Sequence, residues 1–176
     1  CIRDSSSRVW IELLEEVDQC SRILIAGGQG PRNPELLPVL ASLQNDFGIP
    51  VVGDVISNFF SEGSFISGQD LFLTEQHETD LESLQPDLLI TFGNSFISKN
   101  LKLFCRRNRP AIHWHLHTGS ELTDTFQSVT RIIPIEAAGF FQQLVEELEM
   151  KLFREGEDSS VDEAFLNQWQ RVDAKV

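Results

Sequence analysis

The sequence predicts an α/β protein with a Rossmann-like, mostly parallel sheet of about six strands and helices on both faces. Apolar runs of about five residues alternate along the chain with amphipathic helical patterns. Glycine or proline stands between these segments, as is usual where βαβ units turn. Because the runs are apolar throughout, we expect strands that are buried on both faces and joined by right-handed crossovers.

Each element follows from its own pattern. Trp10, Leu13, Leu14 and Val17 recur at helical spacing, so a helix is expected near the start of the chain. The predicted strands are 22–26, 50–55, 88–92, 111–116 and 129–133. The predicted helices that follow them are 34–47, 96–108, 135–153 and 161–172. Segment 57–74 is expected to be a long loop with a short helical stretch near Asp70.

Composition excludes several classes of protein. The net charge of −13 would repel a nucleic-acid backbone, so nucleic-acid binding is not expected. No apolar run approaches the roughly 20 residues of a transmembrane helix. The three cysteines, Cys1, Cys20 and Cys105, lack CxxC spacing, which argues against a disulfide framework or a zinc site and favours the cytoplasm.

A glycine-rich turn follows the first predicted strand. Gly27, Gly28 and Gly30 approximate the G-x-G-x-x-G pattern that lets a backbone approach a pyrophosphate, but the third glycine is missing. Asp54 lies near the end of the next strand, where an acid that binds a ribose could stand. The alternative is a plain strand-to-helix turn, which favours glycine for conformational reasons alone. Both interpretations remain open.

Three histidines alternate along one strand. His113, His115 and His117 share a face, and imidazole is a common metal ligand. Their Cβ atoms are roughly 7 Å apart, however, whereas a metal needs nitrogens that converge on one point at about 2 Å. We expect histidines that form local hydrogen bonds and no metal site. Cys105 is likewise expected to be a buried helical cysteine and not a nucleophile.

Basic residues gather in one short segment. Five of the 14 Lys and Arg residues fall between Lys99 and Arg109. Lys99 would lie in the first turn of a helix at the carboxyl end of the sheet, where α/β domains bind ligands. A cation there opposes the helix dipole, which makes sense if a bound anion is shared between them. The alternative, a solvated lysine, costs only a few tenths of a kcal/mol and also remains open.

The segments ILIAGGQG, PVVGDVISN, GQDLFL, PDLLITFGNSFISKNLKLF and PAIHWHL, taken in order, resemble the middle domain of the MenD family. This family comprises the 2-succinyl-5-enolpyruvyl-6-hydroxy-3-cyclohexene-1-carboxylate synthases of menaquinone biosynthesis. The resemblance runs from about Arg22 to Phe153. It implies a linker and helix over residues 1–21, the middle domain over 22–154 and a linker helix over 155–176.

The resemblance also implies the rest of the protein. Family members carry a pyrimidine-binding domain before the middle domain and a diphosphate-binding domain after it, and they form homodimers or homotetramers. The complete enzyme decarboxylates 2-oxoglutarate on thiamine diphosphate, with Mg²⁺, and joins the product to isochorismate. Cys1 in place of an initiator methionine favours a piece of such a polypeptide. The metal-binding GDG motif of the family is absent, so the piece is expected to be inactive alone and to bind neither cofactor nor metal.

One site residue carries over from the family. A lysine at the position of Lys99 contacts the carboxylated substrate, and in some relatives an arginine follows it, where this chain has Asn100. No catalytic residue is expected in this segment. Lys102, one helical turn further along, is expected to face solvent. The alternative to the whole interpretation is a stand-alone α/β module that binds a nucleotide or a small anion.

Overall fold

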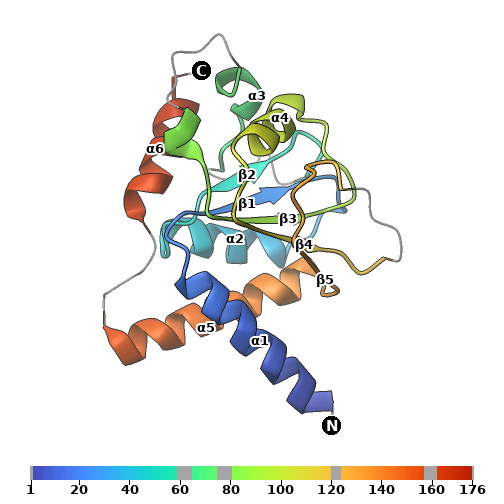
Figure 1. Cartoon of the computed structure of the whole chain (residues 1–176), viewed down its shortest axis with the longest axis vertical. Helices are drawn as coiled ribbons and strands as arrows, with labels where there is room; N and C mark the ends of the chain where they lie inside the picture. The colour runs from blue at the N-terminus through green and yellow to red at the C-terminus, as the bar shows by residue number, and fades with distance from the viewer. Residues whose placement is uncertain (1, 59–64, 75–80, 120–123, 157–161, 176) are drawn as a thin grey trace.

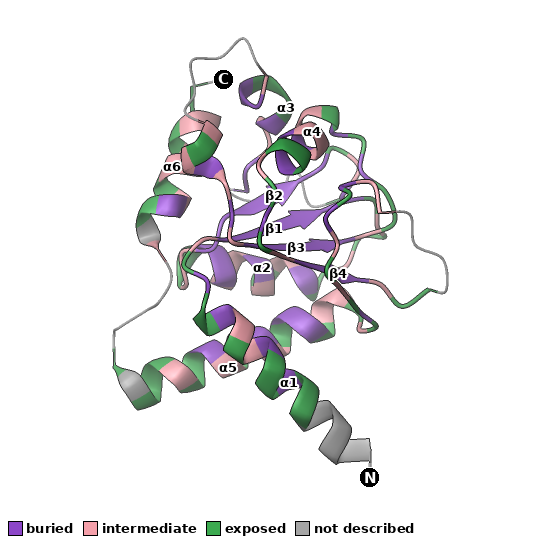
Figure 2. Cartoon of the chain, in the orientation of Figure 1, coloured by how far each residue is buried: buried purple, intermediate pink, exposed green. Residues whose placement is uncertain are grey.

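A computed structural model describes residues 2–58, 65–74, 81–119, 124–156 and 162–175. Its centre is a parallel sheet with strand order β2-β1-β3-β4-β5 (Figure 1). The strands are β1 (Ile23–Gly27), β2 (Val51–Gly53), β3 (Leu88–Phe92), β4 (Ile112–Leu116) and β5 (Arg131–Ile133). Every residue of β1, β2 and β3 is buried, as their uninterrupted apolar runs predict (Figure 2).

The α/β prediction is confirmed, but the expected six strands are five in the described part of the chain. Beyond β2 the sheet continues only as an isolated bridge between Val52 and Ile66. Ile66 donates its N–H to Val51 O and accepts from Gly53 N, both at 3.0 Å. The short helix α3 (Gln69–Phe72) begins three residues later, so the chain turns away before a ladder can form. This helix is the helical stretch expected near Asp70.

Helices cover both faces of the sheet (Figure 1). On one face α1 (Ile2–Asp18), α2 (Leu36–Asn45) and α5 (Ala137–Glu155) enclose an apolar core that includes Trp10, Leu40 and Phe140. On the other face α3, the 3₁₀ turn η1 (Leu81–Leu84), α4 (Lys99–Arg107) and α6 (Glu163–Asp173) enclose a second core. The sheet therefore has no solvated face, which is the usual state of a parallel sheet. No described helix has both the length and the apolar character that crossing a bilayer requires.

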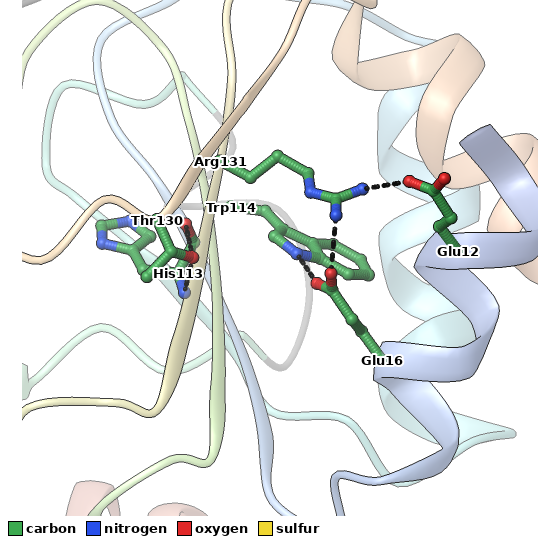
Figure 3. Close-up of polar contacts among 6 residues, drawn as sticks. All are labelled: Glu12, Glu16, His113, Trp114, Thr130 and Arg131. Carbon is green, nitrogen blue, oxygen red and sulfur yellow. Dashed lines mark hydrogen bonds and ion pairs between the residues drawn. The ribbon is translucent and has the colours of Figure 1, made fainter.

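The first helix, α1, is hydrogen-bonded to side chains of β4 and β5. Glu16 of α1 accepts a hydrogen bond from the buried indole Nε1 of Trp114 at 2.7 Å and one from Arg131 Nη2 at 2.8 Å (Figure 3). A second acid of α1, Glu12, lies 3.5 Å from Arg131 Nη1. Apolar residues of the same helix, among them Leu13 and Val17, enter the core. The helix is therefore part of the packed structure.

The last helix also packs on the sheet. The side chains of Phe165 and Trp169 are fully buried in the second core. Asp173, at the end of α6, accepts hydrogen bonds from the backbone N–H groups of Ser67 and Gly68. The helix that the sequence suggested would lead away from the domain lies against it instead, because its apolar stripe completes one face of the core. The boundaries 1–21, 22–154 and 155–176 themselves remain a prediction.

Candidate functional site

The functional edge of the sheet is set by its topology. The strands β1 and β3 are neighbours in the sheet. The chain leaves β1 toward β2 on one side and leaves β3 toward β4 on the other, so the connections after these two strands run in opposite directions. Such a reversal at the carboxyl ends of parallel strands is the usual ligand position in α/β sheets. Here the two loops touch, because Gln29 N donates to Ser95 O at 2.7 Å and Asn94 N donates to Gln29 O at 2.8 Å.

This contact explains the glycines of the first turn. A Cβ atom on Gly28 would lie 2.4 Å from the backbone oxygen of Ser95, a distance at which the two loops would have to separate. Gly93, in the other loop, has a φ of +94° and would place a Cβ 2.8 Å from the backbone of Gly28. The glycine at position 28 therefore serves loop packing, and Gly30 has open space beside it. Asn58, with a φ of 60°, holds this turn by donating Nδ2 to Gly30 O.

A cavity of about 160 Å³ opens between these loops and the first turns of α2 and α5. It is lined by backbone and side chains of both glycine turns, by the segment after β4 and by the start of α5. Its polar lining includes Ser57, Asn94, His117 and Thr118. Neither Lys99 nor Asn100 lines it. The edge of the sheet thus carries two separate features, the cavity and the start of α4.

The start of α4 is occupied by carboxylates of the protein itself. Asp54, which is almost fully buried, accepts hydrogen bonds from the N–H groups of Ile97 and Ser98 at 2.7 and 2.9 Å. Asp70 accepts from Ser98 Oγ and Asn100 N, and Ser98 Oγ in turn accepts from Leu101 N. These acids provide the negative charge that a helix N-terminus favours. Asp54 is therefore an internal cap, and its hydrogen bonds leave it poorly placed to bind a ribose.

Lys99 and its neighbours differ in their surroundings. The Lys99 side chain is exposed and has no hydrogen bond or ion pair with the rest of the described chain. Asn100 is tied down, because its Nδ2 donates to Asp70 O at 2.7 Å. Lys102 does not face solvent as expected. It is half-buried and donates Nζ to Phe96 O at 2.9 Å, since the loop before α4 brings that carbonyl within reach.

His113 and His115 form hydrogen bonds within the protein, as expected, whereas the Nε2 atoms of His115 and His117 have no partner among the described residues. Thr91 Oγ1 lies 2.8 Å from His113 Nε2 and 2.7 Å from His115 Nδ1, and Ser128 Oγ lies 2.8 Å from His113 Nδ1. The His117 ring stacks on that of His115, with 5.7 Å between the centroids. Both nitrogens of His113 are thus engaged within the protein. The part of the chain that the structure describes contains no group of three His, Cys, Asp or Glu side chains placed to hold a metal ion.

Burial sets the protonation of the groups in the second core. Desolvation lowers the pKa of both His113 and His115 from 6.5 to about 4, and the nearby charge of Asp124 only partly opposes this. Both imidazoles are therefore neutral at pH 7. Desolvation also raises the pKa of the Cys105 thiol to about 12, in keeping with a buried helical cysteine that is not a nucleophile.

Sequence reasoning missed the roles of Asp54 and Asp70 as partners of the α4 start, and it missed Ser57 as a cavity residue. The acids stand in the motifs PVVGDVISN and GQDLFL, but the sequence separates Asp54 from Ser98 by 44 residues. An acid near a strand end gives no signal of which helix it will cap. Only the packing of β2 and α3 beside α4 brings these groups together.

Comparison with known proteins gives a consistent result. Residues 7–155 match the protein family described as "Middle domain of thiamine pyrophosphate". The 2-succinyl-5-enolpyruvyl-6-hydroxy-3-cyclohexene-1-carboxylate synthase of Cytophaga hutchinsonii is 33% identical over 78% of this chain and 24% of its own length. The synthase of the same name from Flavobacterium johnsoniae is 32% identical over 73% of this chain and 23% of its own length.

A third relative matches over more of the chain. The synthase of Porphyromonas gingivalis is 28% identical over 96% of this chain and 28% of its own length. The chain spans about a quarter of the length of these relatives. The match to the family covers the whole sheet, α5 and all of α1 after its first five residues, and thus more than three quarters of the residues. This chain therefore belongs to the family of middle domains of thiamine pyrophosphate enzymes.

Proposed function

We propose that this chain is the middle domain of a longer synthase of menaquinone biosynthesis that depends on thiamine diphosphate. The complete enzyme would decarboxylate 2-oxoglutarate on the cofactor and join the resulting acyl unit to isochorismate by a carbon–carbon bond. The observation that carries the proposal is the family match over residues 7–155, together with three relatives that bear the name of the same synthase. The enzyme is proposed to be a cytoplasmic homodimer or homotetramer.

The cofactor chemistry is assigned to domains outside this chain. The buried acid at the carboxyl edge, Asp54, accepts hydrogen bonds from backbone N–H groups on both carboxylate oxygens, and Asp70 accepts two hydrogen bonds on Oδ1. Both carboxylates therefore stabilise the start of α4 within this chain. A pyrimidine-binding domain and a diphosphate-binding domain of the same polypeptide would hold thiamine diphosphate and Mg²⁺. The chain alone is proposed to be an inactive scaffold with one contact to substrate.

Lys99 is proposed to make that contact. It lies at the carboxyl edge of the sheet, is exposed, and begins a helix whose N–H groups are already bonded to Asp54, Asp70 and Ser98. Asp54 and Asp70 already supply the negative charge that the N-terminus of α4 favours. The ammonium group of Lys99 would therefore pair with a substrate carboxylate without help from the helix N-terminus. Asn100 is bonded to Asp70 and supports the turn, which leaves it little freedom to act as a second substrate contact.

The test uses the polypeptide that contains this chain, assayed with 2-oxoglutarate, isochorismate, thiamine diphosphate and Mg²⁺. A charge-assisted hydrogen bond contributes about 1.5–3 kcal/mol, so Lys99→Ala should lower kcat/KM for isochorismate by about ten- to a hundredfold. The affinity for thiamine diphosphate should be unchanged. Arg154→Ala removes an exposed helical cation at the far end of α5 and is the control.

The possible outcomes separate the two parts of the proposal. A polypeptide without synthase activity under these conditions contradicts the function. An active polypeptide in which Lys99→Ala and Arg154→Ala have equally small effects contradicts the substrate contact and leaves the domain with an architectural role.

A further inference from the structure

The place of Lys99 is set by the residues on either side of it. Its side chain forms no hydrogen bond or ion pair with the described residues, so only the backbone of the first turn of α4 determines where it lies. Asp70 is bonded to both neighbours of Lys99. Its Oδ1 atom accepts from Ser98 Oγ at 2.8 Å and from Asn100 N at 3.2 Å. Its backbone oxygen accepts from Asn100 Nδ2 at 2.7 Å, so hydrogen bonds to one residue fix the chain before and after Lys99.

Asp70 is itself held on a firm support. It belongs to α3, which lies beside α4 (Figure 1). The side chain of Phe72 from the same helix is fully buried in the second core, where its ring meets that of Trp169 edge-on. Gln69, the first residue of α3, donates Nε2 to Gly53 O at 3.1 Å and so ties the helix to the end of β2. Because α3 is anchored in these two ways, Asp70 can hold the start of α4 in one place.

The two carboxylates at the start of α4 differ in burial. Asp54 is 1% exposed and accepts from the backbone N–H groups of the two residues before Lys99. Its removal would leave buried N–H groups without an acceptor, which would destabilise the fold. Asp70 is exposed, and the N–H group of Asn100 that it binds lies near the surface, where water can replace the carboxylate. The effect of Asp70 on the reaction can therefore be measured in a folded enzyme.

We propose that Asp70 is a positioning residue for the reaction, which holds the first turn of α4 so that the ammonium group of Lys99 meets the substrate carboxylate. This inference rests on the proposed function, because it requires that Lys99 contacts isochorismate. Asp70 acts through Lys99 and touches neither substrate nor cofactor. Both of its side-chain hydrogen bonds end on Oδ1, and Oδ2 accepts none from the described residues. One oxygen atom is therefore enough for the role.

Steady-state kinetics of the polypeptide that contains this chain test the inference. Asp70→Ala removes Oδ1 and should raise KM for isochorismate by about three- to tenfold, less than Lys99→Ala does, because only the part of the contact that depends on placement is lost. The values of kcat and of KM for 2-oxoglutarate should be unchanged. Asp70→Asn keeps an oxygen in the place of Oδ1 and should restore KM for isochorismate. In a Lys99→Ala background, Asp70→Ala should have no further effect, because the group that it places is absent.

Asp162→Ala is the matched control. Asp162 caps α6 by accepting from Ala164 N at 2.9 Å, and it lies at the amino edge of the sheet, where its own N–H donates to Ser21 O. This variant should leave both KM values unchanged. The inference is wrong if Asp70→Ala leaves KM for isochorismate unchanged, if Asp70→Asn does not restore it, or if Asp70→Ala keeps its full effect beside Lys99→Ala. In each of these cases the substrate contact of Lys99 still stands. An unchanged KM in Lys99→Ala contradicts that contact, and this inference with it.

Discussion

The contact that fastens α1 to the sheet gives the sharpest test of the packing. Glu16 accepts hydrogen bonds from Trp114 and Arg131, and we expect Glu16→Ala to break both (Figure 3). The two bonds differ in environment. The Trp114 side chain is fully buried, whereas the Arg131 side chain is 33% exposed. The loss of stability in Glu16→Ala should therefore come mainly from the indole N–H of Trp114, which would be buried without a hydrogen-bond acceptor.

The magnitude follows from this difference. A hydrogen bond from a buried N–H to a carboxylate contributes about 1.5–3 kcal/mol, while a partly exposed ion pair contributes at most about 1 kcal/mol. Alanine costs nothing in helix propensity relative to glutamate. We expect Glu16→Ala to lower the free energy of unfolding by about 2–3 kcal/mol. For a chain of 176 residues this corresponds to a fall in Tm of about 4–12 °C.

Urea unfolding followed by tryptophan fluorescence and circular dichroism measures the loss. Glu12→Ala is the matched control, because the Glu12 side chain is 52% exposed and forms an ion pair with Arg131 at 3.5 Å, so its effect should stay within about 0.5 kcal/mol. In the Trp114→Phe background the indole N–H is absent, and Glu16→Ala should then cost less than about 1 kcal/mol. An equal loss in both backgrounds would refute the assignment of the stabilisation to the Trp114–Glu16 hydrogen bond.

Two further predictions concern pH and cofactor. His113 and His115 have a pKa of about 4 in the folded chain against 6.5 in the unfolded chain, so the unfolded state binds more protons between these values. This contribution to stability should be nearly complete at pH 7.5, and stability should fall by about 1–3 kcal/mol when the pH is lowered from 7.5 to 5.5, as measured by urea unfolding at each pH. A fall that persists undiminished in His113→Gln would show that other groups are responsible. Calorimetric titration of the chain with thiamine diphosphate and Mg²⁺ should give no binding, and micromolar affinity would contradict the proposed division of labour among domains.

Part of the candidate site was visible in local patterns. The apolar runs, the glycine turn after β1 and the proline before β4 placed the strands and the carboxyl edge, because strand burial and turn chemistry act over a few residues. The burial of Cys105 and the hydrogen bonding of His113 and His115 were predicted in the same way, from residue type and from the alternation along the strand. The motif that contains Lys99 also placed this residue in the first turn of a helix, although the helix begins at Lys99 and not near Phe96 as predicted.

Other features depend on contacts between distant segments. The sequence alone predicted a parallel α/β sheet, because apolar runs of about five residues alternate with amphipathic helical patterns that can cover both faces of the sheet. It did not determine that Asp54 caps α4, that Ser57 and the start of α5 line one cavity, or that α6 completes the second core. Those outcomes depend on which loops meet at the reversal between β1 and β3, and on side chains many residues apart that become neighbours only when the helices pack. The conformational preferences of a short segment do not depend on residues that are distant in the sequence. These contacts therefore follow only from the tertiary structure.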